Sequence, residues 1–303
     1  AAEISTKAKT WLGVASIPII LYTLLPIGWI LSLSLKPDSD LSDGNYFPLS
    51  PDFHNYRLIL TGAAHSLFDP ALRNSIGICL IATFIGVALA TTCAYAIARL
   101  DFAGKKLILT TALGVAVFPV ISIVTPLFNL WRSIGLYNTW PGLIIPYLSL
   151  TLPISIWTLT AFFRQIPWEM EQAAQVDGAT SWQAFRKVVF PLAAPGVFTT
   201  AIISFFTAWN DFVFATSLTS TTGGTSPLKV HGAQTVPAVL GFFSGQSQFI
   251  PPPGYVAAAA GVRTSPSVPR VLAYLTRIGP GLPSGPVRGY AVPRLPPHER
   301  PTA

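Results

Sequence analysis

Long uninterrupted apolar runs constrain the fold of this chain more than any other feature of its sequence. Only 10% of the residues are charged, whereas soluble domains carry about 25%. A tilted helix needs roughly 20 apolar residues to cross the hydrocarbon core of a bilayer. The sequence therefore predicts an all-α integral membrane protein with five clear transmembrane helices, one for each uncharged run: Thr10–Leu35, Asn74–Ala98, Leu107–Trp131, Ser133–Phe163 and Val188–Asn210.

The basic residues between these runs predict the orientation of the chain. Lys7 and Lys9 precede the first run, and further groups of Lys and Arg follow the second and the fourth runs. Positive charge collects on the cytoplasmic side of membrane proteins. We therefore expect a multi-pass protein of a bacterial plasma membrane, surrounded by lipid, with a cytoplasmic N-terminus. The formal charge of +7 is explained by this placement and needs no nucleic-acid partner.

Two regions depart from straight apolar helices. Pro119 and Pro126 interrupt the third run and predict a kink. Residues 261–303 contain nine Pro and six Arg but one acidic residue, Glu299. A sixth span near Tyr255–Leu282 would be interrupted by several of these residues. We therefore expect a transmembrane domain over residues 1–260, a degenerate or missing sixth helix, and an irregular tail over residues 261–303.

The segment between the fourth and fifth runs, residues 167–195, has the pattern of two short helices. Gly178 can adopt the left-handed conformation that ends a helix. Thr180 and Gln183 have the spacing of a capping box that begins the next helix, and Pro191 is predicted to end it.

This segment carries features of a docking element. Trp182, Phe185 and Val189 are spaced to share one helix face, small residues allow close approach, and Arg186 and Lys187 add positive charge. One alternative is an amphipathic helix that lies on the lipid surface. A DNA-reading helix-turn-helix is disfavoured, because the segment is tethered between two spans and lacks a basic recognition face.

Several motifs resemble those of binding-protein-dependent ABC importer permeases. The run Glu171-Gln-Ala-Ala-x-x-Asp177-Gly178-Ala179, followed by Pro191, is similar to their EAA loop, although position 172 is Gln where the general pattern has Glu. The resemblance extends from about Trp11 to Leu218 and is strongest to the maltose and trehalose branch, on the basis of four further motifs: Asn74-Ser75, Ala94-Tyr-Ala-Ile-Ala-Arg99, Asn138-Thr-Trp-Pro-Gly142 and Ala208-Trp-Asn-Asp211-Phe.

The resemblance implies an ABC importer permease fold and a set of partners. In this family the EAA loop couples the permease to a separate ATPase, so the partners would be a sister permease subunit, a dimer of ATPase subunits and an external sugar-binding lipoprotein. The chain contains no GxxxxGK[ST] motif, so ATP and Mg would be bound by the ATPase and this subunit would be neither an enzyme nor a cofactor carrier. The implied coupling residues are Glu171, Ala173, Ala174, Asp177, Gly178, Trp182, Phe185, Arg186 and Pro191.

A second candidate site lies at the end of the fifth run, where Trp209, Asn210 and Asp211 follow one another. An acid within a membrane span is expensive and often functional. If these residues line a pore, the indole could stack on a sugar ring while the polar pair binds hydroxyl groups. The alternative is a helix-end acid that reaches water. The four His are scattered without metal-binding spacing.

Together these features predict the transmembrane permease subunit of an ATP-driven importer for a disaccharide such as trehalose. The alternative is a secondary transporter or channel that works without an ATPase. Such transporters usually place ionisable residues at the middle of the membrane. Apart from Asp211, the five runs contain none, which favours the importer.

Overall fold

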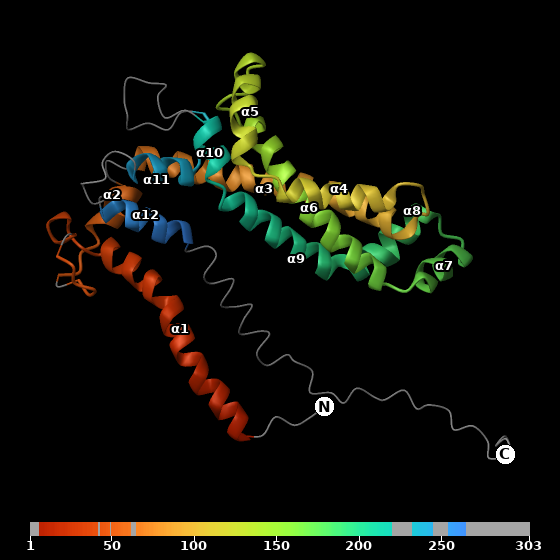
Figure 1. Ribbon diagram of the computed structural model, residues 1–303, viewed down its shortest axis with the longest axis horizontal. Helices are drawn as coiled ribbons and strands as arrows, with labels where there is room; N and C mark the ends of the chain where they lie inside the picture. Colours follow the sequence, from red (N-terminus) through yellow and green to blue (C-terminus); the bar gives the residue numbers. More distant parts are fainter. Residues whose placement is uncertain are drawn as a thin grey trace. The chain divides into compact units, whose positions relative to one another are not determined.

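The computed structural model describes residues 6–41, 43–48, 50–61, 65–219, 232–244 and 254–264. These residues form helices and turns, with no β-strand among them (Figure 1). The helices are α1 (Thr6–Ser34), α2 (His54–Leu60), α3 (His65–Arg99), α4 (Lys105–Val117), α5 (Ile121–Ser133), α6 (Trp140–Gln165), α7 (Trp168–Val176), α8 (Ser181–Ala184), α9 (Phe190–Trp209), α10 (Val213–Leu218), α11 (Val236–Ser244) and α12 (Gly254–Thr264), with a 3-10 turn, η1 (Asp38–Asp40), and a π-helical turn, η2 (Phe185–Val189).

Three helical stretches are long and apolar enough to cross a membrane. They are Phe68–Arg99 of α3, the whole of α6, and the continuous stretch Ser181–Trp209 that ends with α9. The pair α4 and α5 would add a fourth span if both helices belong to one crossing. Helix α1 has 29 residues, but its described apolar part, Leu21–Ser34, is shorter than a span. The all-α membrane fold is confirmed, and the count of five helices stays a prediction.

The third apolar run is broken, and the break is much sharper than a kink. Helices α4 and α5 meet at an angle of 92°. Phe118 has the extended conformation, with φ of −67° and ψ of 134°, as expected for a residue whose α conformation is disfavoured by a following proline. Pro119 therefore separates the two helices, whereas Pro126 is accommodated inside α5.

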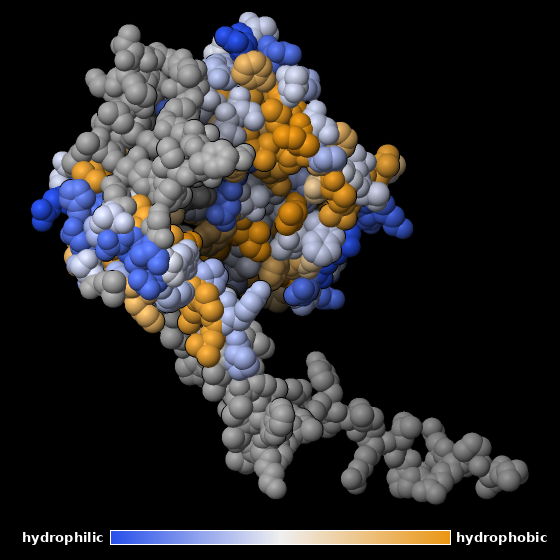
Figure 2. Space-filling model, turned by 60° about the vertical axis from the view of Figure 1, so that its left-hand side comes forward, coloured by the Kyte–Doolittle hydropathy of each residue, from blue (hydrophilic) through white to orange (hydrophobic). Residues whose placement is uncertain are grey.

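The centre of the fold is a bundle in which α3, α6 and α9 pack against one another. Figure 1 shows α7 and α8 together at one end of this bundle and α5 and α10 at the other. Small residues on α3, Ala82, Ala90 and Ala94, are completely buried and let the helix axes approach closely. Many large apolar side chains remain exposed, as on Val117 and Phe198, and Figure 2 shows a face where such side chains gather.

Polar side chains tie residues 232–236 to α3 and to the turn before α6. The Asn74 amide donates to the carbonyls of Gly232 (2.8 Å) and Gln234 (2.9 Å) and accepts from the Trp140 indole (3.0 Å). The Ser75 hydroxyl accepts from the Val236 amide at 2.9 Å. The Asn138 side-chain oxygen accepts from the Ala233 amide at 3.2 Å. The two motifs that begin at Asn74 and Asn138 therefore have a structural role, since they fix the segment that leads into α11.

The loop between α1 and α3 contains the short helix α2. The Lys36 side chain is fully buried and forms an ion pair with Asp43. The hydrogen bond from this ammonium group lowers the pKa of the Asp43 carboxyl. Because a buried ammonium ion is stable only when it is paired, this contact anchors the loop to the end of α1.

The predicted domain boundary at residue 260 falls inside a helix. Helix α12 continues to Thr264, and a compact unit of the chain ends at Arg263. Residues 265–303, which hold most of the predicted tail and of the predicted sixth span, lie outside the described residues.

Candidate functional site

The two short helices predicted between the fourth and fifth runs are present as α7 and α8. Gly178, which follows α7, has a φ of +88°, in the left-handed region that favours glycine. The Thr180 hydroxyl accepts from the Gln183 amide (3.3 Å), and the Gln183 side chain accepts from the Thr180 amide (2.9 Å). This reciprocal capping box begins α8. We refer to residues 168–184 as the elbow.

The prediction that Pro191 ends the second helix is wrong. Helix α8 runs into the π-helical turn η2 and continues through Pro191 as α9. In the wider turn the Phe190 amide donates to the Phe185 carbonyl, five residues back. Pro191 then stands in the first turn of α9, where its missing N–H is tolerated. The elbow is therefore joined to a membrane-spanning helix without an intervening loop.

Glu171 is buried at the junction of α7 with α3. It is 2% exposed, and its carboxylate lies 3.3 Å from the Arg99 guanidinium nitrogen. The Tyr95 hydroxyl donates to the other carboxylate oxygen. Arg99 also donates to the Ile166 carbonyl at 3.0 Å and lies 5.2 Å from the Trp168 ring centre. We name this group of residues, Tyr95, Arg99, Trp168 and Glu171, the α3–α7 clamp.

An aromatic cluster extends the clamp to η2. The Phe185 ring lies 4.5 Å from the Tyr95 ring and 6.4 Å from the Phe163 ring, measured between ring centres. Phe185 is 7% exposed. It is therefore packed within this chain and does not face outward as the docking hypothesis for this residue requires.

The other residues of the predicted coupling set differ in how exposed their side chains are. Trp182 is 64% exposed and stacks on the outer side of Phe185, with 5.4 Å between ring centres. Ala174 is half-buried. The exposed members of the predicted coupling set are Ala173, Asp177, Gly178, Trp182, Arg186 and Pro191. The elbow thus has a buried side at Glu171, next to the buried Phe185 of η2, and an exposed side on which Trp182 is the most exposed aromatic ring.

The second candidate site, at Trp209, Asn210 and Asp211, is not an open ligand site. The Trp209 ring is 6% exposed and stacks on Phe205. Asp211 accepts from the Ala215 amide at 3.0 Å and from the Phe214 amide at 3.5 Å, so its carboxylate caps the first turn of α10. Asp211 lies at a helix end, as in the alternative interpretation, but its carboxylate is engaged by backbone amides. Only Asn210 is exposed.

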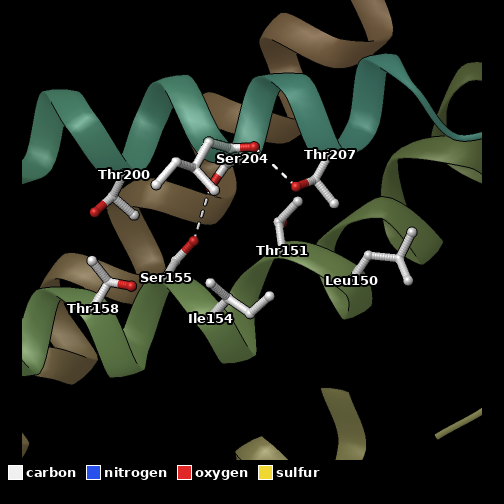
Figure 3. A pocket seen from close by; sticks show the side chains of 9 residues that line it. Leu150, Thr151, Ile154, Ser155, Thr158, Thr200, Ser204 and Thr207 are labelled. Carbon is white, nitrogen blue, oxygen red and sulfur yellow. Dashed lines mark hydrogen bonds between the residues drawn. The ribbon is translucent and has the colours of Figure 1, made fainter. Parts of the chain in front are cut away.

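A groove between α6 and α9 was not anticipated from the sequence. Figure 3 shows side chains of the two helices pointing toward one another across it. The depression between them is narrow, with room for about one water molecule. Six hydroxyl side chains line it: Thr151, Ser155 and Thr158 from α6, and Thr200, Ser204 and Thr207 from α9. The signal in the sequence is that each trio has the spacing i, i+4, i+7, which places its members on one helix face.

The described residues form no metal-binding site. Among them, no three His, Cys, Asp or Glu side chains are grouped closely enough to hold a metal ion.

Comparison with known proteins identifies the family. Residues 70–268 match the family described as the binding-protein-dependent transport system inner membrane component. The chain belongs to this family. The match extends well past Leu218, so the family likeness covers more of the chain than the sequence motifs indicate.

Two relatives of this chain are permease proteins of sugar transport systems. It is 50% identical over 283 residues to the trehalose transport system permease protein SugB of Mycobacterium tuberculosis, which covers 93% of this chain and 99% of that protein. It is 33% identical over 277 residues to the trehalose/maltose transport system permease protein MalG of Thermococcus litoralis, covering 91% and 95%. The chain is therefore a non-catalytic permease subunit and a multi-pass inner membrane protein.

A solved structure supports the fold independently. The permease matches a chain from the crystal structure of a bacterial ABC transporter involved in the import of the acidic polysaccharide alginate, with a TM-score of 0.69 and 20% identity. The match covers 90% of this chain and 99% of that chain. The ABC permease fold predicted from the motifs is confirmed.

Proposed function

We propose that this permease is a subunit of an ATP-driven importer for a neutral disaccharide such as trehalose. The observation that carries the proposal is the 50% identity to a trehalose permease along nearly the whole of both chains. The subunit would form half of the translocation path together with a sister permease. An external sugar-binding lipoprotein would deliver the substrate, and a dimer of ATPase subunits on the cytoplasmic side would bind ATP and Mg.

The elbow is the part of the chain suited to contact the ATPase. Its buried side is held to α3 by the α3–α7 clamp, and η2 joins it directly to α9. A force applied to the exposed side would therefore move two spans with it, because packed helices transmit displacement as rigid bodies. The basic residues near the N-terminus and after the second and fourth apolar runs are expected on the same side of the membrane as the elbow. Under this proposal the N-terminus therefore lies in the cytoplasm.

Purification and transport assays test the proposal. The tagged permease, isolated in detergent from its own cells, is expected to bring an ATPase subunit and a second permease with it. In proteoliposomes with the binding protein, trehalose should stimulate ATP hydrolysis, and uptake should require ATP. Uptake by the isolated chain without ATP would instead identify a secondary transporter or channel.

Trp182 is expected to anchor the ATPase. Trp182 is the most exposed aromatic residue of the elbow, and buried aromatic anchors contribute about 2 kcal/mol or more to interfaces. Trp182→Ala should therefore weaken retention of the ATPase during purification by roughly 30-fold. Trp157→Ala, which removes a 54% exposed tryptophan from α6, is the control and should retain the ATPase. Full retention by Trp182→Ala would favour an elbow that lies on lipid.

A further inference from the structure

We infer that the groove between α6 and α9 is a contact surface for the sugar on its way through this subunit. This inference rests on the proposed function and assigns the substrate to a specific place in the chain. It replaces the site at Trp209 and Asp211, whose side chains are engaged inside the fold.

The hydroxyl groups of the groove are arranged to accept hydrogen bonds. Thr151 donates its proton to the Tyr147 carbonyl, Thr200 to that of Gly196 and Thr207 to that of Ile203, each at 2.9 Å. The oxygen of each hydroxyl retains lone pairs that can accept from a ligand. A sugar offers several hydroxyl protons, so its donors match the acceptors of the groove.

Two further hydroxyls define the middle of the groove. The Ser155 and Ser204 hydroxyls bond to each other at 2.9 Å across the two helices, as Figure 3 shows. Both serines are buried, at 2% exposure, so they lie beneath the accessible part of the groove, and the half-buried Thr158 and Thr207 are the hydroxyls that a sugar can reach. Thr158 is half-buried, and its hydroxyl has no hydrogen-bond partner within the described residues.

Helix packing alone does not account for the groove. Threonine and serine in membrane helices often bond to the preceding turn of their own helix, which would explain each residue singly. It does not explain why both trios face the same open space, or why Ile154 and Ile203 at its edge remain 44% exposed.

The chemistry of the lining selects a class of sugar. None of the nine lining residues is charged. Acceptor oxygens without a cation disfavour a carboxylate or sulfonate, which would lose its hydration without gaining a partner. The groove should therefore contact neutral sugars and reject acidic ones.

Site-specific labelling tests the assignment in the complete transporter. Thr158→Cys, in a background with Cys93→Ser and the buried Cys79 retained, reports access to the groove through its reaction with a methanethiosulfonate reagent. In the complex arrested with ATP and vanadate, trehalose at ten times its half-maximal concentration should slow labelling by about tenfold. An acidic disaccharide should not slow it. Thr207→Cys is a second reporter if the first variant does not assemble.

Two comparisons make the test specific. Trp157→Cys, on α6 outside the groove, should label at the same rate with and without trehalose. Thr207→Val, added to Thr158→Cys, should raise the trehalose concentration for half-maximal protection by about three- to tenfold, the effect of one neutral hydrogen bond.

The outcomes separate the two proposals. Uptake of radiolabelled trehalose by the unmodified complex, without protection of either groove cysteine, would overturn the groove assignment and leave the importer intact. Protection of Trp157→Cys to the same degree would also overturn it, because a general closure would then explain the effect. Absence of ATP-dependent trehalose uptake by the unmodified complex would overturn the proposed function, and the groove assignment with it.

Discussion

Glu171→Gln is expected to abolish most sugar uptake while leaving the permease in the membrane. The substitution keeps the shape of the side chain but leaves the Arg99 guanidinium, itself buried at 6% side-chain exposure, without its counter-ion. Removing one partner of a buried ion pair destabilises the local structure by roughly 3–5 kcal/mol. Helix α7 should then detach from α3, and uptake in proteoliposomes should fall by about tenfold or more.

Two further variants separate this effect from a general loss of charge. Glu169→Gln makes the same change two residues earlier, at an exposed position, and should leave uptake nearly unchanged. Arg99→Gln combined with Glu171→Gln removes both buried charges and should recover part of the activity, because no unpaired ion remains. Normal uptake by the single variant Glu171→Gln would show that the α3–α7 clamp does not position the elbow.

The features predicted correctly from the sequence depend on residues close together in the chain. The capping box requires Thr180 and Gln183, three residues apart, and the left-handed turn requires only Gly178. The apolar runs are likewise local, because hydrocarbon imposes the same demand on each helix separately. Such signals can be read without knowing which helices touch.

The features missed from the sequence depend on contacts between distant residues. Glu171 meets Tyr95 and Arg99, more than seventy positions earlier, so its burial could not be distinguished from an exposed helix start. Phe185 packs against Tyr95 of α3 and Phe163 of α6, so its inward position also depends on residues far away in the sequence. The spacing of Trp182, Phe185 and Val189 indicates a shared helix face but does not tell which side of that helix is covered.

The groove illustrates an intermediate case. The i, i+4, i+7 trios on α6 and α9 are visible in the sequence, but a helix also carries serine and threonine for packing. Only the pairing of α6 with α9 makes the two trios face each other and establishes the Ser155–Ser204 bond. The same limitation applies to the 92° angle between α4 and α5, since a proline predicts a break and not its direction.

Gly178→Val should uncouple ATP hydrolysis from uptake. At a φ of +88° a β-branched residue is strained by about 1–2 kcal/mol, so the turn between α7 and α8 would relax to another conformation. A steric clash cannot cause this effect, since a Cβ at this position would meet no atom within 4 Å. We expect membrane insertion to persist and the number of sugar molecules imported per ATP to fall by about five- to 30-fold.

The matched variant for this position is Gly178→Asn, because asparagine tolerates the left-handed conformation better than any β-branched residue. It should retain most of the coupling, although its side chain is larger than that of glycine. The two variants thus separate backbone conformation from side-chain volume at a site where the surrounding space is open. If Gly178→Val imports sugar per ATP as efficiently as the unmodified complex, the angle between α7 and α8 does not transmit the force, and the elbow is not the coupling element.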